Sequence, residues 1–121
     1  MNTRFTGLLA AACTAALTLG ATAASALDIA WVHSNAAAQS EQRVEAGFKK
    51  WLEEQGKSDW NVSFLDSGGS GEATASNIQD AASRGVDAII ITMSDLRASR
   101  AAIDAAHAAN IPVFAVDSGY I

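Results

Sequence analysis

The stretch Val86-Asp87-Ala88-Ile89-Ile90-Ile91-Thr92 decides the fold class of this chain. It is a short β-branched apolar run, and a second such run, Ile111 to Asp117, follows an alanine-rich segment from Arg97 to Ala109. Strands without polar alternation are typically buried on both faces of a sheet, and two of them joined by a helix form a right-handed parallel crossover. We therefore predict a parallel α/β sheet, in which ligands bind at the carboxyl ends of the strands.

The same alternation extends toward the amino terminus. Strands are predicted at Asp28 to His33 and at Trp60 to Asp66, and a helix is predicted from Glu72 to Arg84. Another helix is expected from about Glu41, with Ser40 as its N-cap. Its inner stripe is expected to comprise Val44, Phe48, Trp51 and Leu52. The order β-α-β-α-β-α-β predicts a doubly wound, flavodoxin-like α/β sheet with strand order 2-1-3-4.

The first 26 residues have the pattern of a secretory signal peptide. Arg4 provides a positive start, Phe5 to Ala23 an apolar core, and Ala24-Ser25-Ala26 a small-residue cleavage site, so we expect cleavage after Ala26. A membrane anchor is the disfavoured alternative, because the segment is rich in alanine and threonine and lacks a charged stop-transfer flank. Residues 27–121 are expected to form one domain, and an incomplete one, because its fourth strand would otherwise remain an unpaired edge.

The charge and the cysteine content exclude several classes of protein. The formal net charge is −5, from 13 acidic and 8 basic residues, and an acidic chain without a basic patch is a poor nucleic-acid binder. Cys13, the only cysteine, lies in the signal segment. His33 and His107 are far apart in the topology, and no carboxylate is expected to join either of them as a zinc site requires. We expect no metal, no cofactor and no nucleic-acid partner.

Several segments together carry a family resemblance: Asp28 to Val32, Val62 to Asp66, Asn77 to Asp80, Arg84 to Ile91, and Ala109 to Val113 leading to Val116-Asp117. They resemble the ribose-binding-protein-like family, the periplasmic sugar-binding components of ABC importers. The resemblance covers residues 28–119 of this chain. Proteins of the family have two lobes that close on a sugar about a hinge, and the resemblance is to the amino-terminal lobe only. It implies a non-enzymatic protein of the periplasm that binds a sugar or polyol. It also implies delivery to the permease of an ABC importer in the inner membrane, or contact with a chemoreceptor.

The resemblance also implies a set of ligand-binding residues. Asp117 matches the acidic residue that takes sugar hydroxyls, and an ionised carboxylate can bridge two neighbouring hydroxyls. The next family position is often arginine but is Ser118 here, and Ala38, Ser40 and Glu41 stand where the family often has an asparagine and two aromatic residues. The predicted ligand-binding residues are Asp117, Ser118, Ser34, Asn35, Gln39, Ser40, Asp95 and Tyr120, the last as an aromatic face.

Two motifs have an alternative structural role. Asp95 is also suited to cap the third helix, with its carboxylate on the amides of Arg97 and Ala98, and we favour this role. Ser67 to Gly71 lacks the lysine of a phosphate-binding loop and follows the second strand, so we expect a flexible turn.

A secreted flavodoxin-like enzyme acting at the carboxyl ends of the strands is the alternative function. Hydrolysis would need a nucleophile with a nearby base at the strand ends, and Ser34, Ser94 and Ser118 are predicted there. Only His33 could serve as the base, and no G-x-S-x-G elbow is present. These observations favour the binding protein.

Overall fold

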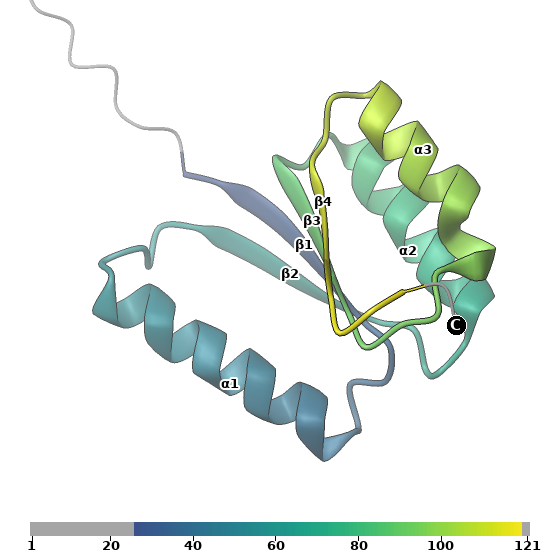
Figure 1. Ribbon diagram of the computed structural model, residues 1–121. Helices are drawn as coiled ribbons and strands as arrows, with labels where there is room; N and C mark the ends of the chain where they lie inside the picture. The colour runs from purple at the N-terminus through teal and green to yellow at the C-terminus, as the bar shows by residue number, and fades with distance from the viewer. Residues whose placement is uncertain (1–25, 120–121) are drawn as a thin grey trace, which may run out of the picture.

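The computed structural model describes residues 26–119, so Tyr120 and all of the predicted signal segment except Ala26 lie outside the described residues. The elements are β1 Asp28–His33, α1 Gln39–Glu54, β2 Asn61–Asp66, α2 Gly71–Arg84, β3 Ala88–Thr92, a 3-10 turn at Arg97–Ser99, α3 Arg100–Ala108 and β4 Val113–Val116. All neighbouring strands pair in parallel, in the order β2-β1-β3-β4 (Figure 1). The predicted doubly wound, flavodoxin-like topology is therefore confirmed. Within the described range, no helix combines the length and apolar character needed to cross a bilayer.

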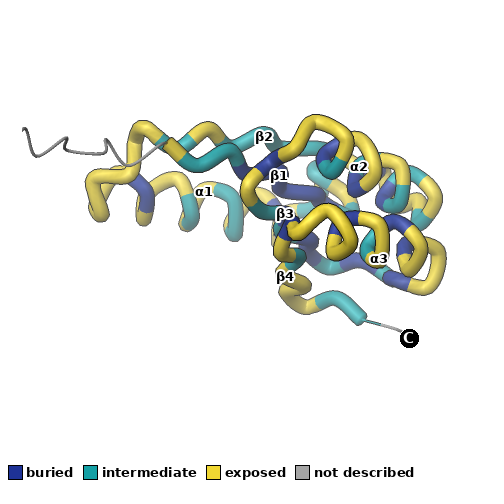
Figure 2. The backbone as a smooth tube through the Cα atoms, turned by 90° about the horizontal axis from the view of Figure 1, so that it is seen from above, coloured by how far each residue is buried: buried dark blue, intermediate teal, exposed yellow. Residues whose placement is uncertain are grey.

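The main core lies between the sheet and the pair of helices α2 and α3. Alternate residues of β1 and β3 point to this side, and small residues on the two helices let them approach the sheet closely. The most buried members of this core are Ala30, Val32, Ile78, Ala81, Ile89, Ile91, Ala102 and Ala106. Figure 2 shows this burial gathered on β1, β3 and the inward sides of α2 and α3. On α2, Ile78 and Ala81 are fully buried and belong to the face turned toward the sheet.

Helix α1 lies on the opposite side of the sheet, beside β1 and β2 (Figure 1). Trp31 of β1 packs against Phe48 with ring centroids 4.7 Å apart, and Leu52 is buried. Trp51, which we expected on the inner stripe, is 43% exposed, stacks on Phe48 and contacts Trp60 edge to face. With 3.6 residues per turn, Phe48 and Leu52 lie near the centre of the stripe and Trp51 lies at its border, which accounts for the exposure.

The helix ends follow local capping chemistry at α2 but not at α1. Ser70 caps α2 by accepting the Ala73 amide at 3.2 Å, and Gly85 ends it in the left-handed conformation with φ 71°. Helix α1 begins at Gln39 after Ala38, and no side chain caps it. The predicted Ser40 cap is therefore wrong, because Ser40 already lies inside the first turn.

Strand β4 is more exposed than a strand buried on both faces. Phe114 is 56% exposed and Val116 is 45% exposed. Their register with Ile90 and Thr92 places both side chains on the α1 side of the sheet. Helix α1 lies beside β1 and β2, at the other end of the sheet, and among residues 26–119 no element covers this face of β4 (Figure 1). The expectation that this strand is buried on both faces is wrong.

Candidate functional site

The four strands end along one side of the sheet, which we call the carboxyl edge and which comprises the loops 34–38, 67–70, 93–96 and 117–119. Two non-glycine residues at this edge have left-handed backbone angles, Met93 with φ 53° and Asp117 with φ 47°. Such conformations cost free energy and are found preferentially at functional sites. A third such residue, Asn110 with φ 60°, precedes β4 at the other end of the sheet, so two of the three in residues 26–119 lie at the edge that the sequence assigns to ligand binding.

Asp117 and Ser118 end β4 but differ in what their side chains can offer. Asp117 is exposed, and its carboxylate has no hydrogen-bond partner among residues 26–119. The Ser118 hydroxyl instead accepts the Ser94 amide at 3.1 Å and lies 3.0 Å from the Val116 carbonyl oxygen, to which it can donate. Asp117 is thus available to a ligand, whereas Ser118 joins the ends of β3 and β4.

The Asp95 carboxylate forms hydrogen bonds with Arg97 of the same protein. Its Oδ1 accepts the Arg97 amide at 3.0 Å and its Oδ2 accepts the Arg97 side chain at 2.7 Å. The Arg97 guanidinium is the main cause of the lowered pKa of the Asp95 carboxyl, with a further contribution from the Arg97 amide. Asp95 does not cap α3 as predicted, because Ser99 stands at the N-cap position of α3 and Leu96 at that of the 3-10 turn, and neither element has a side-chain cap. Of the two predicted amides, Asp95 binds only that of Arg97, the first residue of the 3-10 turn.

The loop after β1, residues 34–38, brings polar groups to the carboxyl edge. Ser34 is partly buried, and its hydroxyl has no hydrogen-bond partner among the described residues. Asn35 is exposed and accepts the Ala37 amide on Oδ1 at 3.0 Å, which leaves its amide donors free for other partners. Gln39 accepts the Arg43 guanidinium at 2.7 Å, and Ser40 is exposed in the first turn of α1. Ser34 and Asn35 are therefore better placed as ligand donors than Gln39.

Asp66, at the end of β2, holds this loop from the side. Its Oδ1 accepts the Ala36 amide and the Gly68 amide, each at 2.9 Å. The first of these hydrogen bonds, followed by the second, lowers the pKa of the Asp66 carboxyl. Asp66 thus joins the loops that follow β1 and β2, a role that we did not predict for it from the sequence.

A buried polar network lies directly beneath the same loop, with Glu41 at its centre. Glu41 is 1% exposed, and its Oε1 accepts the Ser34 amide at 2.9 Å. Its Oε2 accepts the Thr92 hydroxyl at 2.6 Å and lies 2.7 Å from His33 Nδ1. Thr92 Oγ1 in turn accepts the Trp31 indole N–H at 3.2 Å. Buried charged and polar groups require such partners, and this network supplies them.

His33 lies at the end of β1 between two carboxylates of α1. Its Nδ1 faces Glu41, and its Nε2 lies 3.2 Å from Glu45 Oε2. The expectation that no carboxylate joins His33 is therefore wrong. Glu45 also pairs with Lys49, and this hydrogen bond is the largest cause of the lowered pKa of Glu45. Because His33 is 1% exposed and both ring nitrogens are engaged, it is poorly placed to act as the general base of an enzyme.

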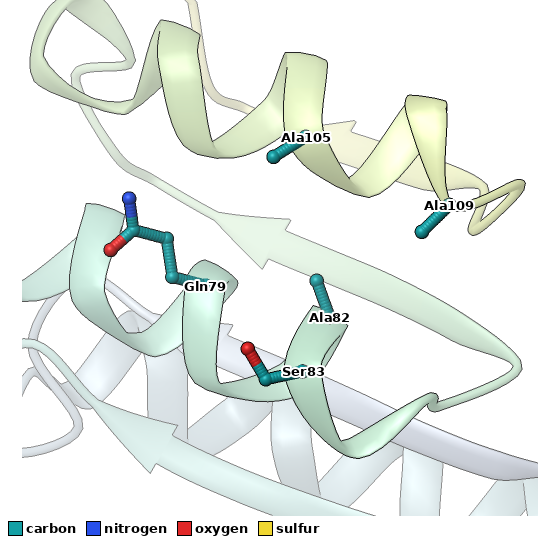
Figure 3. A pocket seen from close by; sticks show the side chains of 5 residues that line it. All are labelled: Gln79, Ala82, Ser83, Ala105 and Ala109. Carbon is teal, nitrogen blue, oxygen red and sulfur yellow. The ribbon is translucent and has the colours of Figure 1, made fainter.

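The remaining features of the described residues are the metal-binding potential of their side chains and a groove between two helices. Residues 26–119 contain no group of three or more histidine, cysteine, aspartate or glutamate side chains that could hold a metal ion. A groove between α2 and α3 is lined by Gln79, Ala82, Ser83, Ala105 and Ala109 (Figure 3). It lies toward the carboxyl ends of the helices, away from the carboxyl edge, and none of its lining residues is charged.

The sequence contains a signal for the buried network, although the network was not predicted. Glu41 lies seven residues and Glu45 three residues before Phe48, so both share the inner stripe of α1 with that apolar residue. Acidic residues on a buried stripe indicate a buried partner. Asp66 ends β2 directly opposite His33 in the register, which is the corresponding signal for a role at the edge.

Comparisons with known proteins bear on this site. A family model described as periplasmic binding protein domain matches residues 29–121. An ABC sugar transporter subunit from Rhodobacter sphaeroides superposes with a TM-score of 0.65 at 22% identity, covering 75% of this chain and 31% of that one. A protein from Mycobacterium smegmatis in complex with β-D-fucofuranose superposes with a TM-score of 0.60 at 25% identity, covering 74% and 29%. The chain therefore spans about a third of these structures, and no curated protein matches it significantly.

Proposed function

Because this chain belongs to the periplasmic binding protein domain family, we propose that it binds a neutral sugar or polyol in the periplasm and presents it to an ABC importer. Residues 27–121 would be the amino-terminal lobe of the binding domain, exported by the signal segment and cleaved after Ala26. The permease of the importer in the inner membrane is the proposed partner, and a chemoreceptor is a second one.

The exposed carboxylate of Asp117 is the observation that carries this proposal. It lies at the end of β4, whereas Ser34 and Asn35 follow β1, and only β3 separates the two strands. Neighbouring strands lie about 4.8 Å apart, so the ends of β1 and β4 are separated by about 10 Å along the carboxyl edge. A carboxylate on one side and amide or hydroxyl donors on the other suit the vicinal hydroxyls of a sugar ring.

The charges along the edge favour a neutral ligand over an acidic one. Asp66 and Asp117 are exposed carboxylates at the ends of β2 and β4, and Asp95 lies between them after β3. The Arg97 guanidinium is occupied by Asp95. A sugar acid or sugar phosphate would therefore meet repulsion at this edge rather than a free cation.

The lobe would bind its ligand weakly by itself. In a two-lobe binding protein, closure about a hinge surrounds the ligand, and each lobe contributes part of the hydrogen bonds. With one lobe, one face of the ligand remains in water. We expect a dissociation constant in the millimolar range, which corresponds to a binding free energy of about −4 kcal/mol.

Titration of neutral monosaccharides into the protein purified from the periplasm, followed by NMR, tests the proposal. The Asp117→Asn variant keeps the size of the side chain and its tolerance of the left-handed backbone but loses the charge. We expect about tenfold weaker binding, the effect of losing a charge-assisted hydrogen bond. Asp104→Asn, an exposed residue of α3, is the matched control and should bind like the unmodified protein. Equal affinities of the two variants would argue against Asp117 as a ligand contact.

A further inference from the structure

We propose that Glu41 is a positioning residue of the ligand site, whose buried carboxylate fixes Ser34 and the rest of the loop 34–38 at the carboxyl edge. The inference rests on the proposed function, because that loop supplies two of the proposed ligand donors. Glu41 itself is 1% exposed, and both of its carboxylate oxygens already accept donors from the protein. Its effect on a ligand would therefore act through Ser34 and not through direct contact.

Three elements meet at this carboxylate. Glu41 is in the first turn of α1, Ser34 follows the end of β1, and Thr92 is the last residue of β3. The carboxylate therefore fixes the beginning of α1 relative to two neighbouring strand ends, and it does so at the point where the loop 34–38 starts. Replacing one of these carboxylate oxygens would therefore displace Ser34 first.

A glutamate is needed here because only a carboxylate can accept on both sides. Two donors face the group, the Ser34 amide on Oε1 and the Thr92 hydroxyl on Oε2, and His33 Nδ1 lies 2.7 Å from Oε2. Glutamine has the same shape, but its NH2 group would face donors on one side. The Ser34 amide also lies 3.2 Å from the Thr92 carbonyl oxygen, so it keeps one acceptor when Glu41 is changed. We therefore expect the loop to shift while the sheet remains intact.

The remaining contacts of the loop make this shift specific to the site. Asp66 accepts the Ala36 amide from the β2 side, and the Ser34 carbonyl oxygen accepts the Gly69 amide at 2.6 Å. Ser34 and Asn35 thus lie between two anchoring carboxylates, Glu41 below and Asp66 beside. Releasing the lower anchor changes the spacing between Ser34 and Asp117 across the edge, and with it the fit of a ligand.

The test uses the full chain exported to the periplasm, with Glu41→Gln as the main variant. Two matched controls lie on the same helix: Leu52→Ala, which removes buried packing outside the network, and Glu53→Gln, which makes the same substitution at an exposed position. For each protein the backbone amide shifts, the melting temperature and the affinities for D-ribose, D-glucose and D-galactose are measured. We expect Glu41→Gln to move the amide signals of residues 34–38 and to weaken sugar binding about tenfold, the effect of one hydrogen bond to a charged group.

The controls separate positioning from a general loss of stability. Leu52→Ala should lower the melting temperature but leave the signals of residues 34–38 and the affinity near those of the unmodified protein. If Leu52→Ala changes these signals and the affinity as much as Glu41→Gln does, the role of Glu41 is merely structural and the proposal is wrong. The proposal also fails if Glu41→Gln behaves like Glu53→Gln.

Two further results keep the outcomes distinct. If none of the three sugars binds the unmodified protein, the proposed function loses its support, whereas a shift confined to residues 34–38 in Glu41→Gln still supports the anchoring by Glu41.

If Glu41→Gln does not fold, Thr92→Val removes one donor to the same carboxylate at nearly equal volume. It should move the same amide signals by a smaller amount, and unchanged signals there would overturn the proposal.

Discussion

Replacing Ser99 by alanine should stabilise this protein. Ser99 ends the 3-10 turn that leads into α3 and has an exposed fraction of 0%. Its hydroxyl has no hydrogen-bond partner within residues 26–119, and although Ser99 stands at the N-cap position of α3, its side chain does not cap the helix. The substitution therefore removes a buried polar group without removing a hydrogen bond.

The expected gain follows from the cost of an unpaired hydroxyl. A buried donor or acceptor without a partner costs about 1–3 kcal/mol, and the small void left by one oxygen atom offsets part of that gain. We expect the free energy of unfolding of Ser99→Ala to rise by about 1 kcal/mol. For a domain of about 100 residues this corresponds to an increase in melting temperature of roughly 4–8 °C.

Urea unfolding and thermal melting, both followed by circular dichroism, measure the effect. Ser83→Ala on the exposed surface of α2 is the control, and it should change the free energy by less than about 0.5 kcal/mol. A destabilised Ser99→Ala protein would refute the reasoning, because it would show that the hydroxyl makes a hydrogen bond that stabilises the native state.

Three further predictions concern the backbone, the uncovered strand and the pH dependence. Gly85→Ala should lower the free energy of unfolding by about 1 kcal/mol in urea titrations, because Gly85 adopts φ 71°. Phe114→Thr should change it by less than about 1 kcal/mol, because Phe114 is more than half exposed. The pKa of Asp66 lies below its ordinary value of 3.8, so its stabilisation of the loop is present above that pH and is lost as the pH falls through the lowered pKa. In NMR titrations the Ala36 and Gly68 amide signals should follow that transition, and Asp66→Asn should abolish it.

Much of the fold follows from local patterns in the sequence. Asp28 to His33 forms β1 with the predicted bounds, and α2 ends at Arg84 as predicted, with Gly85 as its left-handed cap. In both places the local preference and the tertiary packing agree, since an apolar run becomes a central strand and a glycine supplies the left-handed cap. The strand order follows from the alternation of strands and helices, because right-handed crossovers leave few other arrangements.

The errors arise where a neighbouring element decides the outcome. Ser40 is a good N-cap residue by type, but the loop from β1 reaches α1 early enough for the helix to begin at Gln39. Trp51 has an apolar side chain at helical spacing, but it lies at the border of the stripe and remains 43% exposed. Phe114 belongs to a β-branched and aromatic run typical of buried strands, but α1 lies beside β1 and β2 instead of β4. Composition alone does not report which element covers which face.

The location of the candidate site could be predicted from the sequence, but the roles of several of its residues could not. Parallel strands end at one edge, so the location of Asp117, Ser34 and Asn35 follows from the topology. The topology does not show which of these side chains are available to a ligand, because that depends on which polar groups already form hydrogen bonds within the protein. Ser118 and Asp95 are committed to internal hydrogen bonds, and Glu41 is buried at a position where an exposed ring-stacking residue would be expected from the resemblance.

The most direct measurement is a map of the backbone amide shifts that neutral monosaccharides cause in residues 27–121, the proposed single lobe. Binding at the carboxyl edge predicts concentration-dependent shifts in the loops 34–38, 67–70, 93–96 and 117–119, with a dissociation constant in the millimolar range. Shifts centred instead on the groove between α2 and α3, around Gln79 and Ala105, would contradict the proposed site. Spectra that stay unchanged up to tens of millimolar sugar, roughly ten times the expected dissociation constant, would contradict the proposed ligand class.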